Sequence, residues 1–176
     1  MPVRGRGDHD GKLVLRFTAL ADLDFVLALE AGPEARPFIV SWSRRRHTEA
    51  IEDPGQEHLL VVEAERVVGF VLLAGLADDT DNIELRRIVI AEPGQGRGRE
   101  ALTLVLARAF GVLDAHRVWL DVMLRNDRAR HVYRTAGFQK EGVLREAIRG
   151  ANGYESLTVM SILASAWNRT DLIACE

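Results

Sequence analysis

Three glycines alternate with other residues in the stretch Gly94-Gln95-Gly96-Arg97-Gly98, between an apolar segment rich in isoleucine and a segment with helical periodicity. Residues without a Cβ let the backbone fold tightly and turn its N–H groups inward. The start of the following helix adds free N–H donors and a partial positive charge, and Arg97 and Arg99 could add to it. Residues 94–99 therefore predict a site for a pyrophosphate.

The glycine stretch alone leaves two other interpretations open. One is a plain strand–helix turn that requires glycine. The other is a dinucleotide site, because Asp121 lies about 20 residues further on, near the end of the next expected strand. That pattern would need glycine or alanine at Arg99, and the first half of the chain lacks repeated strand–helix–strand units. The chain has no G-K-[ST] sequence, so an ATP site of that kind is unsupported.

Glu84 stands in the apolar segment that precedes the glycines. Counting by twos along an extended strand places it on one face with Arg86, Ile88 and Ile90. A carboxylate there could take a proton from a bound substrate. The alternative is a surface glutamate paired with Arg86 or Arg87.

Tyr133 and Asn126 belong to a second segment of helical periodicity, 126–136. Residues Ala129 and Val132 share a helical face with Tyr133, so the tyrosine points inward. A lone inward tyrosine is usually a packing residue, and an asparagine at a helix start is usually an N-cap. Both could instead contact a ligand.

Alternating and helical patterns divide the rest of the chain into elements. Strands are expected at 12–18, 58–63, 67–74, 83–90, 116–123, 138–140 and 154–162, and helices at 22–30, 41–52, 99–110 and 126–136. The strands pair up first, and a strand–helix–strand–helix–strand block follows. This order predicts one α/β domain of the α+β type, with a mixed, mostly antiparallel sheet and helices on both faces. We expect it to span 12–164, between a flexible tail at 1–11 and a loose tail at 165–176.

The composition is that of a soluble globular protein, with 47% apolar and 28% charged residues among 176 and a net charge of −3. Nothing in it indicates nucleic acid or a membrane as a partner, and no apolar run reaches the roughly 18 residues of a span. Cys175 is the only cysteine, residues 1–11 lack a signal-peptide stretch, and the histidines show no metal-ligand spacing. We therefore expect a cytoplasmic protein without a metal site.

Residues 83–138 resemble the GNAT acetyltransferase superfamily, and most closely its RimJ/RimL-type branch. The likeness rests on ELRRIVIAEPGQGRGREAL, on NDRARHVYRTAGF and on EGVLREAIRGANGYESLTVMSIL. The second stretch matches the family pattern N-x-x-A-x-x-x-Y-x-x-x-G-F. The loop pattern Gln/Arg-x-x-Gly-x-Gly/Ala fits with Gly96 and Gly98 as its glycines, which places Pro93 at its first position. A second register puts Gln95 there.

This resemblance implies direct transfer of an acetyl group from acetyl-CoA to an amine. The glycine loop would hold the pyrophosphate, and the backbone of Ile88, Val89 and Ile90 would pair with pantetheine and offer an oxyanion donor. Glu84 would take the amine proton, directly or through water. Tyr133 would protonate the leaving thiolate, and Asn126 would contact pantetheine.

The acceptor stays open, because the resemblance allows a protein N-terminus, a polyamine, an aminoglycoside or an amino acid. A homodimer is also compatible with it. The run Arg44-Arg45-Arg46 is expected on a solvated helix face, although it could guide an acidic substrate or the nucleotide of CoA. Two other functions remain alternatives: a non-catalytic CoA-binding module and a nucleotide-binding α/β domain.

Overall fold

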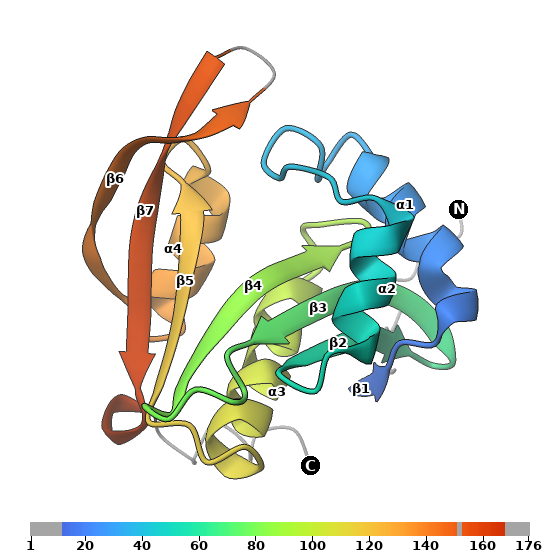
Figure 1. Ribbon diagram of the computed structural model, residues 1–176, viewed down its shortest axis with the longest axis horizontal. Coiled ribbons are helices and arrows are strands. Elements are labelled where there is room, and N and C mark those ends of the chain that lie inside the picture. The colour runs from blue at the N-terminus through green and yellow to red at the C-terminus, as the bar shows by residue number, and fades with distance from the viewer. Residues whose placement is uncertain (1–11, 151–152, 168–176) are drawn as a thin grey trace, which may run out of the picture.

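A computed structural model describes residues 12–150 and 153–167 of the chain. Its described part forms one seven-stranded sheet in the order β1-β2-β3-β4-β5-β7-β6 (Figure 1). The strands are β1 (Leu13–Phe17), β2 (Gln56–Glu63), β3 (Arg66–Ala74), β4 (Asn82–Ile90), β5 (Arg117–Met123), β6 (Gln139–Gly150) and β7 (Gly153–Leu163). The helices are α1 (Leu23–Ala31), α2 (Arg44–Glu52), α3 (Arg97–Gly111) and α4 (Asp127–Thr135), with short 3₁₀ turns η1 (Leu20–Asp22) and η2 (Ala164–Ala166).

Strand directions confirm the mixed, mostly antiparallel sheet. Among the paired strands of the described chain, β4 and β5 run parallel, and the other five pairs run antiparallel. A dinucleotide-binding fold needs an open sheet built mostly of parallel strands joined by helices. The dinucleotide interpretation of the glycine stretch is therefore wrong.

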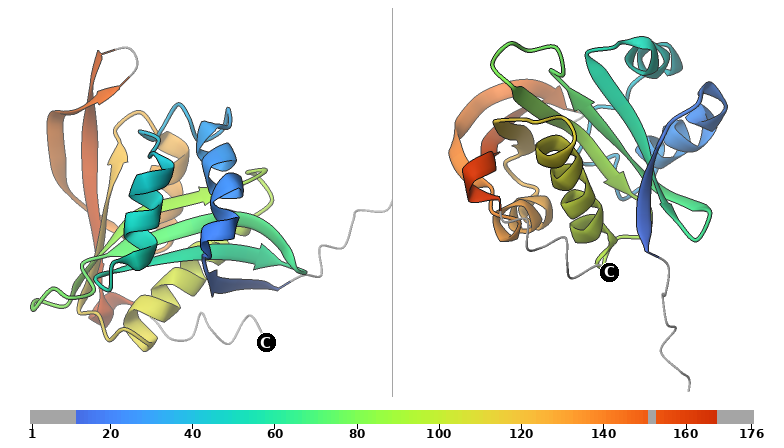
Figure 2. Two further views of the ribbon diagram at one scale, coloured as in Figure 1. Left: turned by 45° about the vertical axis from the view of Figure 1, so that its right-hand side comes forward. Right: turned by 90° about the horizontal axis from the view of Figure 1, so that it is seen from below.

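Helices cover both faces of the sheet, as expected. Helices α1 and α2 lie on one face and α3 and α4 on the other (Figure 2). The buried side chains follow this division along β3: Phe70 and Leu72 pack towards the α1/α2 side, whereas Val71 and Leu73 join the larger core under α3. Alternate side chains of β3 therefore contribute to two hydrophobic cores, one on each face of the sheet.

Local signals explain where several elements begin and end. The β2–β3 hairpin turns at Ala64 and Glu65, which have φ of 45° and 68°. Positive φ at both central residues is what a type I′ hairpin turn requires. The Ser43 hydroxyl accepts a hydrogen bond from the Arg46 N–H and caps α2. Gly137 has a φ of 98° and follows α4 at the C′ position expected for it.

The last hairpin and the C-terminal boundary differ from expectation. The strand expected at 138–140 is β6, which runs to Gly150 as an outer strand with mostly exposed side chains and two register shifts. The packed chain also continues past Ala164, since the Trp167 ring lies 5.4 Å from the Phe110 ring. The expected tails at 1–11 and beyond Trp167 lie outside the described residues. None of the described helices is long and apolar enough to span a membrane.

Candidate active site

The two parallel strands separate after a short pairing. Register between β4 and β5 covers Asn82↔Arg117, Ile83↔Val118 and Glu84↔Trp119 and then stops. Beyond Glu84, the edge of β4 that faces β5 has no strand partner in the described chain. A cavity of about 590 Å³ opens there, lined by both strands, by α4, by the segment between α1 and α2, and by β6 and β7. Unpaired backbone groups therefore face a cavity of substrate size.

A bulge at Arg86 changes which β4 side chains share a face. Leu85 pairs with Leu73 of β3 and Arg87 pairs with Leu72, so Arg86 is the extra residue. Before the bulge Glu84 points to the α1/α2 side, and after it Arg87 and Val89 do. Ile88 and Ile90 pack against the α3 core instead. The prediction that Glu84 shares a face with Ile88 and Ile90 was therefore wrong, because counting by twos fails across a bulge.

Two carboxylates from neighbouring strands line the cavity where the strands part. Glu84 on β4 accepts hydrogen bonds of 2.6 and 3.0 Å from the Arg86 guanidinium, so the ion pair expected for it is present. Asp121 on β5 also lines the cavity and stays accessible there. Desolvation raises the pKa of Asp121, the negative charge of Glu84 raises it further, and Arg86 opposes both. The sequence indicated Asp121 only as a possible dinucleotide ligand.

Tyr133 joins this group from α4. Its ring packs 5.7 Å from the Phe138 ring, and its hydroxyl makes no hydrogen bond within the described chain. Desolvation raises the pKa of Tyr133, and the negative charge of Asp121 raises it further. The inward orientation predicted for Tyr133 is confirmed, and the hydroxyl keeps its proton at neutral pH.

Asn126 combines the two roles that its sequence position suggested as alternatives. Its Oδ1 accepts a hydrogen bond of 3.1 Å from the Ala129 N–H, which confirms the N-cap of α4. The same side chain lines the cavity. Its amide NH₂ has no partner in the described chain and is available to a ligand.

The glycine stretch forms a concave turn of backbone N–H groups. Gly94 and Gly96 have φ of 99° and 80°, and Gly96 is the N-cap of α3. The N–H groups of residues 94–98 donate to no other group of the described chain, whereas Arg99 and Glu100 donate back to the Gly96 carbonyl. A Cβ built on Gly94, Gly96 or Gly98 would meet no atom within 4 Å. The loop thus offers free donors and open space at a helix N-terminus, the arrangement that binds phosphates.

The two arginines of this loop behave differently. The Arg97 side chain is buried and paired with Glu63 of β2 at 2.7 Å and with Glu92 at 3.3 Å. It fastens the loop to the sheet, so the supplementary phosphate charge predicted for its side chain is not available and only its N–H remains. The Arg99 side chain is exposed, with no ion pair among the described residues, and could meet a phosphate.

A sequence model of the acetyltransferase (GNAT) family matches residues 25–138, from α1 to the end of the α4 segment. The chain belongs to this family. Its members use acetyl-CoA, so this GNAT chain is an acyl-CoA-dependent N-acetyltransferase that transfers an acetyl group to an amine. The fold and function that the sequence predicted are thereby confirmed at this level.

Similar proteins of known sequence and structure agree with the assignment. The spermidine N(1)-acetyltransferase of Vibrio cholerae is 30% identical over 125 residues, which are 69% of this chain and 72% of the relative. A crystal structure of spermidine N-acetyltransferase from the same organism, in complex with CoA and spermine, superimposes with a TM-score of 0.79 at 26% identity, over 88% of this chain and 97% of the other. A dodecameric structure of that enzyme has a TM-score of 0.76 at 27% identity, over 88% and 95% of the two chains.

Proposed function

We propose that Glu84, Asp121 and Tyr133 carry out acetyl transfer to a primary amine by direct attack within a ternary complex. The observation that carries the proposal is the cavity where β4 and β5 part. One space there brings together a carboxylate pair, a protonated hydroxyl and an unpaired strand edge. Direct transfer needs a proton acceptor, a proton donor and an oxyanion donor in one place.

Acetyl-CoA would lie along β4. Its pantetheine could pair with the free backbone groups of Ile88, Val89 and Ile90, with the Asn126 amide as a further contact. Its pyrophosphate would meet the N–H groups of residues 94–98 and the Arg99 guanidinium. This arrangement places the thioester beside Tyr133 and leaves the α1/α2 side of the cavity for the amine.

Proton transfer follows from these positions. The amine arrives mostly as an ammonium with a pKa near 10, and Glu84 takes its proton directly or through water, with Asp121 adding negative charge nearby. The neutral nitrogen attacks the thioester carbonyl, and a β4 N–H at Val89 or Ile90 stabilises the oxyanion. When the C–S bond breaks, the thiolate takes the Tyr133 proton, and the second proton of the product nitrogen passes through water to the Tyr133 phenolate and restores the hydroxyl.

The loop is tested by Gly98→Val, for which we expect CoA affinity to fall at least tenfold, about 1.4 kcal/mol. Gly98 is helical and a Cβ there meets no protein atom within 4 Å, so a loss would come from the space that the ligand needs. Calorimetric titration with CoA measures it. Gly111→Val in the same helix, also in open space, is the control. Unchanged affinity in folded Gly98→Val would remove the loop assignment.

The base is tested by Glu84→Gln, for which we expect about tenfold lower kcat/KM at neutral pH. The acidic limb of the rate–pH profile should change, and activity should recover partly at high pH, where more of the amine is neutral. Arg86→Gln removes the ion pair and leaves the Glu84 carboxylate, so this variant should retain the acidic limb of the rate–pH profile. A uniform loss with an unshifted profile, or loss of the limb in Asp121→Asn alone, would mean that Glu84 is not the base.

Three finer assignments also belong to the proposal. The RimJ/RimL-type branch rests on the three sequence stretches that resemble it, whereas the Vibrio cholerae relatives are spermidine enzymes. The dodecamer of the Vibrio relative supports a homo-oligomer, of which a homodimer is the smallest form. We propose a cytoplasmic location from the composition and the lone Cys175. Thiol release with a panel of amines distinguishes the enzyme from a non-catalytic CoA-binding module.

A further inference from the structure

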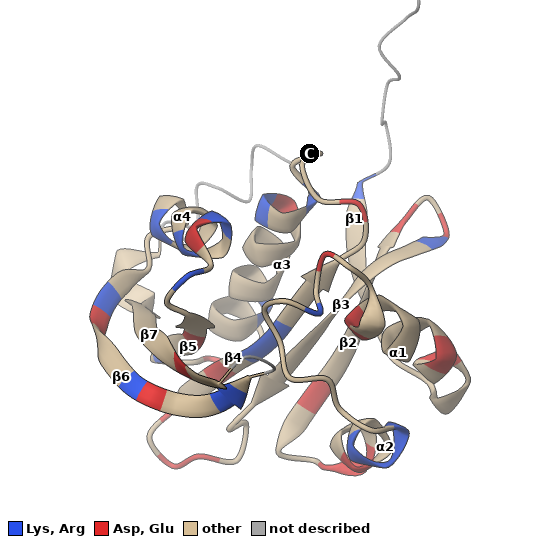
Figure 3. Cartoon of the chain, turned by 90° about the horizontal axis from the view of Figure 1, so that it is seen from above, with Lys and Arg blue, Asp and Glu red and all other residues tan. Residues whose placement is uncertain are grey.

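Arginines outnumber carboxylates around the cavity. Five arginines and three acidic residues line it: Arg46, Arg86, Arg87, Arg128 and Arg149 with Glu34, Glu84 and Asp121. Three of the arginines form ion pairs: Arg86 with Glu84, Arg128 with Glu34, and Arg87 with the buried Glu30, which does not line the cavity. Figure 3 shows basic segments on α2, β4 and β6, three of the elements that line the cavity. The lining groups left without an ion pair in the described chain are Arg46, Arg149 and Asp121.

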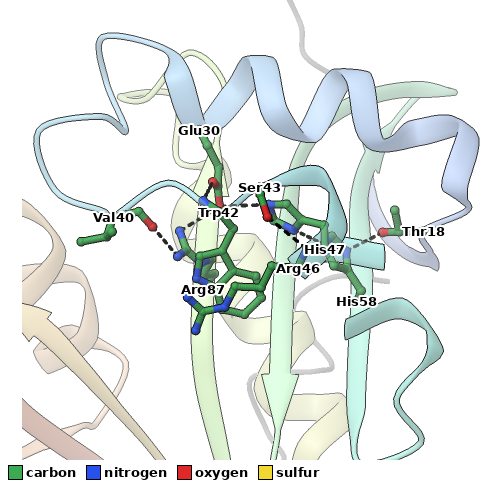
Figure 4. Close-up of polar contacts among 9 residues, drawn as sticks. All are labelled: Thr18, Glu30, Val40, Trp42, Ser43, Arg46, His47, His58 and Arg87. Atoms are coloured by element: carbon green, nitrogen blue, oxygen red, sulfur yellow. Dashed lines mark hydrogen bonds and ion pairs between the residues drawn. The ribbon is translucent and has the colours of Figure 1, made fainter. Parts of the chain in front are cut away.

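A buried polar network holds the wall that carries Arg46 (Figure 4). Glu30, 1% exposed, accepts hydrogen bonds from the Trp42 N–H at 2.7 Å and from Arg87 at 2.8 Å. Arg87 also donates to the Val40 carbonyl at 2.6 Å. The Arg46 guanidinium lies 3.9 Å from the centre of the Trp42 ring, a cation–π contact. Arg46 is thus positioned at the cavity while its charge stays free for an anion.

The two cavity arginines without an ion pair in the described chain, Arg46 and Arg149, lie away from the proposed phosphate site of CoA. Arg46 belongs to α2, which lies on the sheet face opposite α3 (Figure 2). The glycine loop leads into the start of α3. Arg149 lies near the end of β6, in the hairpin that forms the other wall, and the loop residues 94–98 do not line the cavity. Arg46 and Arg149 therefore face the space left for the acceptor.

We propose that the acceptor is a primary amine that also carries an anionic group, a carboxylate or a phosphate. This rests on the proposed function. The ammonium is received by Glu84 and Asp121, and the anion by Arg46 and Arg149, which are unscreened by any carboxylate of their own. A polyamine would bring several positive charges into a cavity with two free guanidiniums, and like charges at close range oppose binding. The acceptor class thus differs from that of the spermidine-acetylating relatives.

The test uses two sets of amines matched except for charge: γ-aminobutyrate against its carboxamide and putrescine, and the C-terminal amide of alanyl-aspartate against that of alanyl-asparagine. Aminopropylphosphonate and spermidine are added as a phosphonate and a polyamine. Thiol release gives kcat/KM for each, and calorimetric titration into CoA-saturated protein gives its affinity. We expect the anionic member of each set to exceed its neutral and cationic partners at least tenfold. The phosphonate and carboxylate arms then identify the preferred anion.

Variants decide whether the two arginines cause the preference. Two single variants are made, Arg46→Gln and Arg149→Gln on the exposed β6. Each should lower the ratio of kcat/KM for the anionic amine to kcat/KM for its neutral partner at least threefold. Arg45→Gln is the control, because Arg45 lies on the same helix, is exposed and pairs with Glu49. Equal or better use and binding of carboxamide, putrescine or spermidine would overturn the inference and leave the acetyltransferase assignment intact. Anion-selective binding without thiol release would uphold the inference and contradict the proposed chemistry.

Discussion

Replacing Tyr133 with phenylalanine should lower turnover by about 10²-fold while CoA affinity stays near normal. The hydroxyl faces the cavity without a hydrogen-bond partner in the described chain, and its raised pKa keeps it protonated. An alkyl thiol such as that of cysteine has a pKa near 8.5, so the leaving thiolate takes up a proton in neutral solution. Phenylalanine keeps the ring that packs on Phe138, so the fold should be retained. Steady-state thiol release and calorimetric titration with CoA measure the two quantities.

The other tyrosine of the chain provides the control. Tyr154 at the start of β7 is 68% exposed and lies outside the cavity lining, so Tyr154→Phe should leave turnover unchanged. Near-normal turnover of Tyr133→Phe together with a lower melting temperature would assign Tyr133 to packing. The proton for the thiolate would then come from water.

Acidification should remove about 3 kcal/mol of folding stability through His58 between pH 6.5 and pH 4. The His58 ring is 3% exposed and forms contacts of 3.0 Å with His47 and 2.9 Å with Thr18. Burial and, to a smaller extent, the nearby His47 lower the pKa of His58 from 6.5 to about 4, with Glu30 opposing them. Over this window the unfolded chain binds a proton that the folded chain does not. Stability is therefore full above pH 6.5 and falls as the pH drops towards 4.

Denaturant unfolding at several pH values measures this effect, since the slope of the unfolding free energy against pH counts protons. His58→Gln should flatten that slope by about one proton between pH 6.5 and 4. An equal slope in His58→Gln and the parent chain would show that His58 does not resist protonation.

Local sequence signals predicted much of the fold and part of the site. The apolar segments that form β2 to β5, the N-cap at Asn126 and the glycines before α3 each depend on neighbours a few residues away, and each is present in the structure. The mixed sheet followed from the order of the elements. The inward orientation of Tyr133 followed from the helical period, because α4 packs on one side only.

The features that were missed depend on residues distant in sequence. The bulge at Arg86 depends on how β4 pairs with β3, and no residue type within β4 predicts it. Arg97 looked like a phosphate ligand because Glu63, its half-buried partner, lies 34 positions earlier. Asp121 gains its raised pKa partly from Glu84 on the neighbouring strand. The length of β6 was hidden because an outer strand with two exposed faces has no apolar alternation.

The single extra residue in β4 has a consequence for kinetic order. It turns Glu84 to one side of the sheet and leaves Ile88 and Ile90 on the other. If Glu84 receives the amine as proposed, the amine and the thioester would reach the opening between β4 and β5 from opposite directions. In the proposed site neither ligand blocks the path of the other, and each product can dissociate while its partner is still bound. The sequence of arrival and release is then set by relative affinities rather than by obstruction, and a tightly held CoA would make its own departure the slow step at saturating substrate.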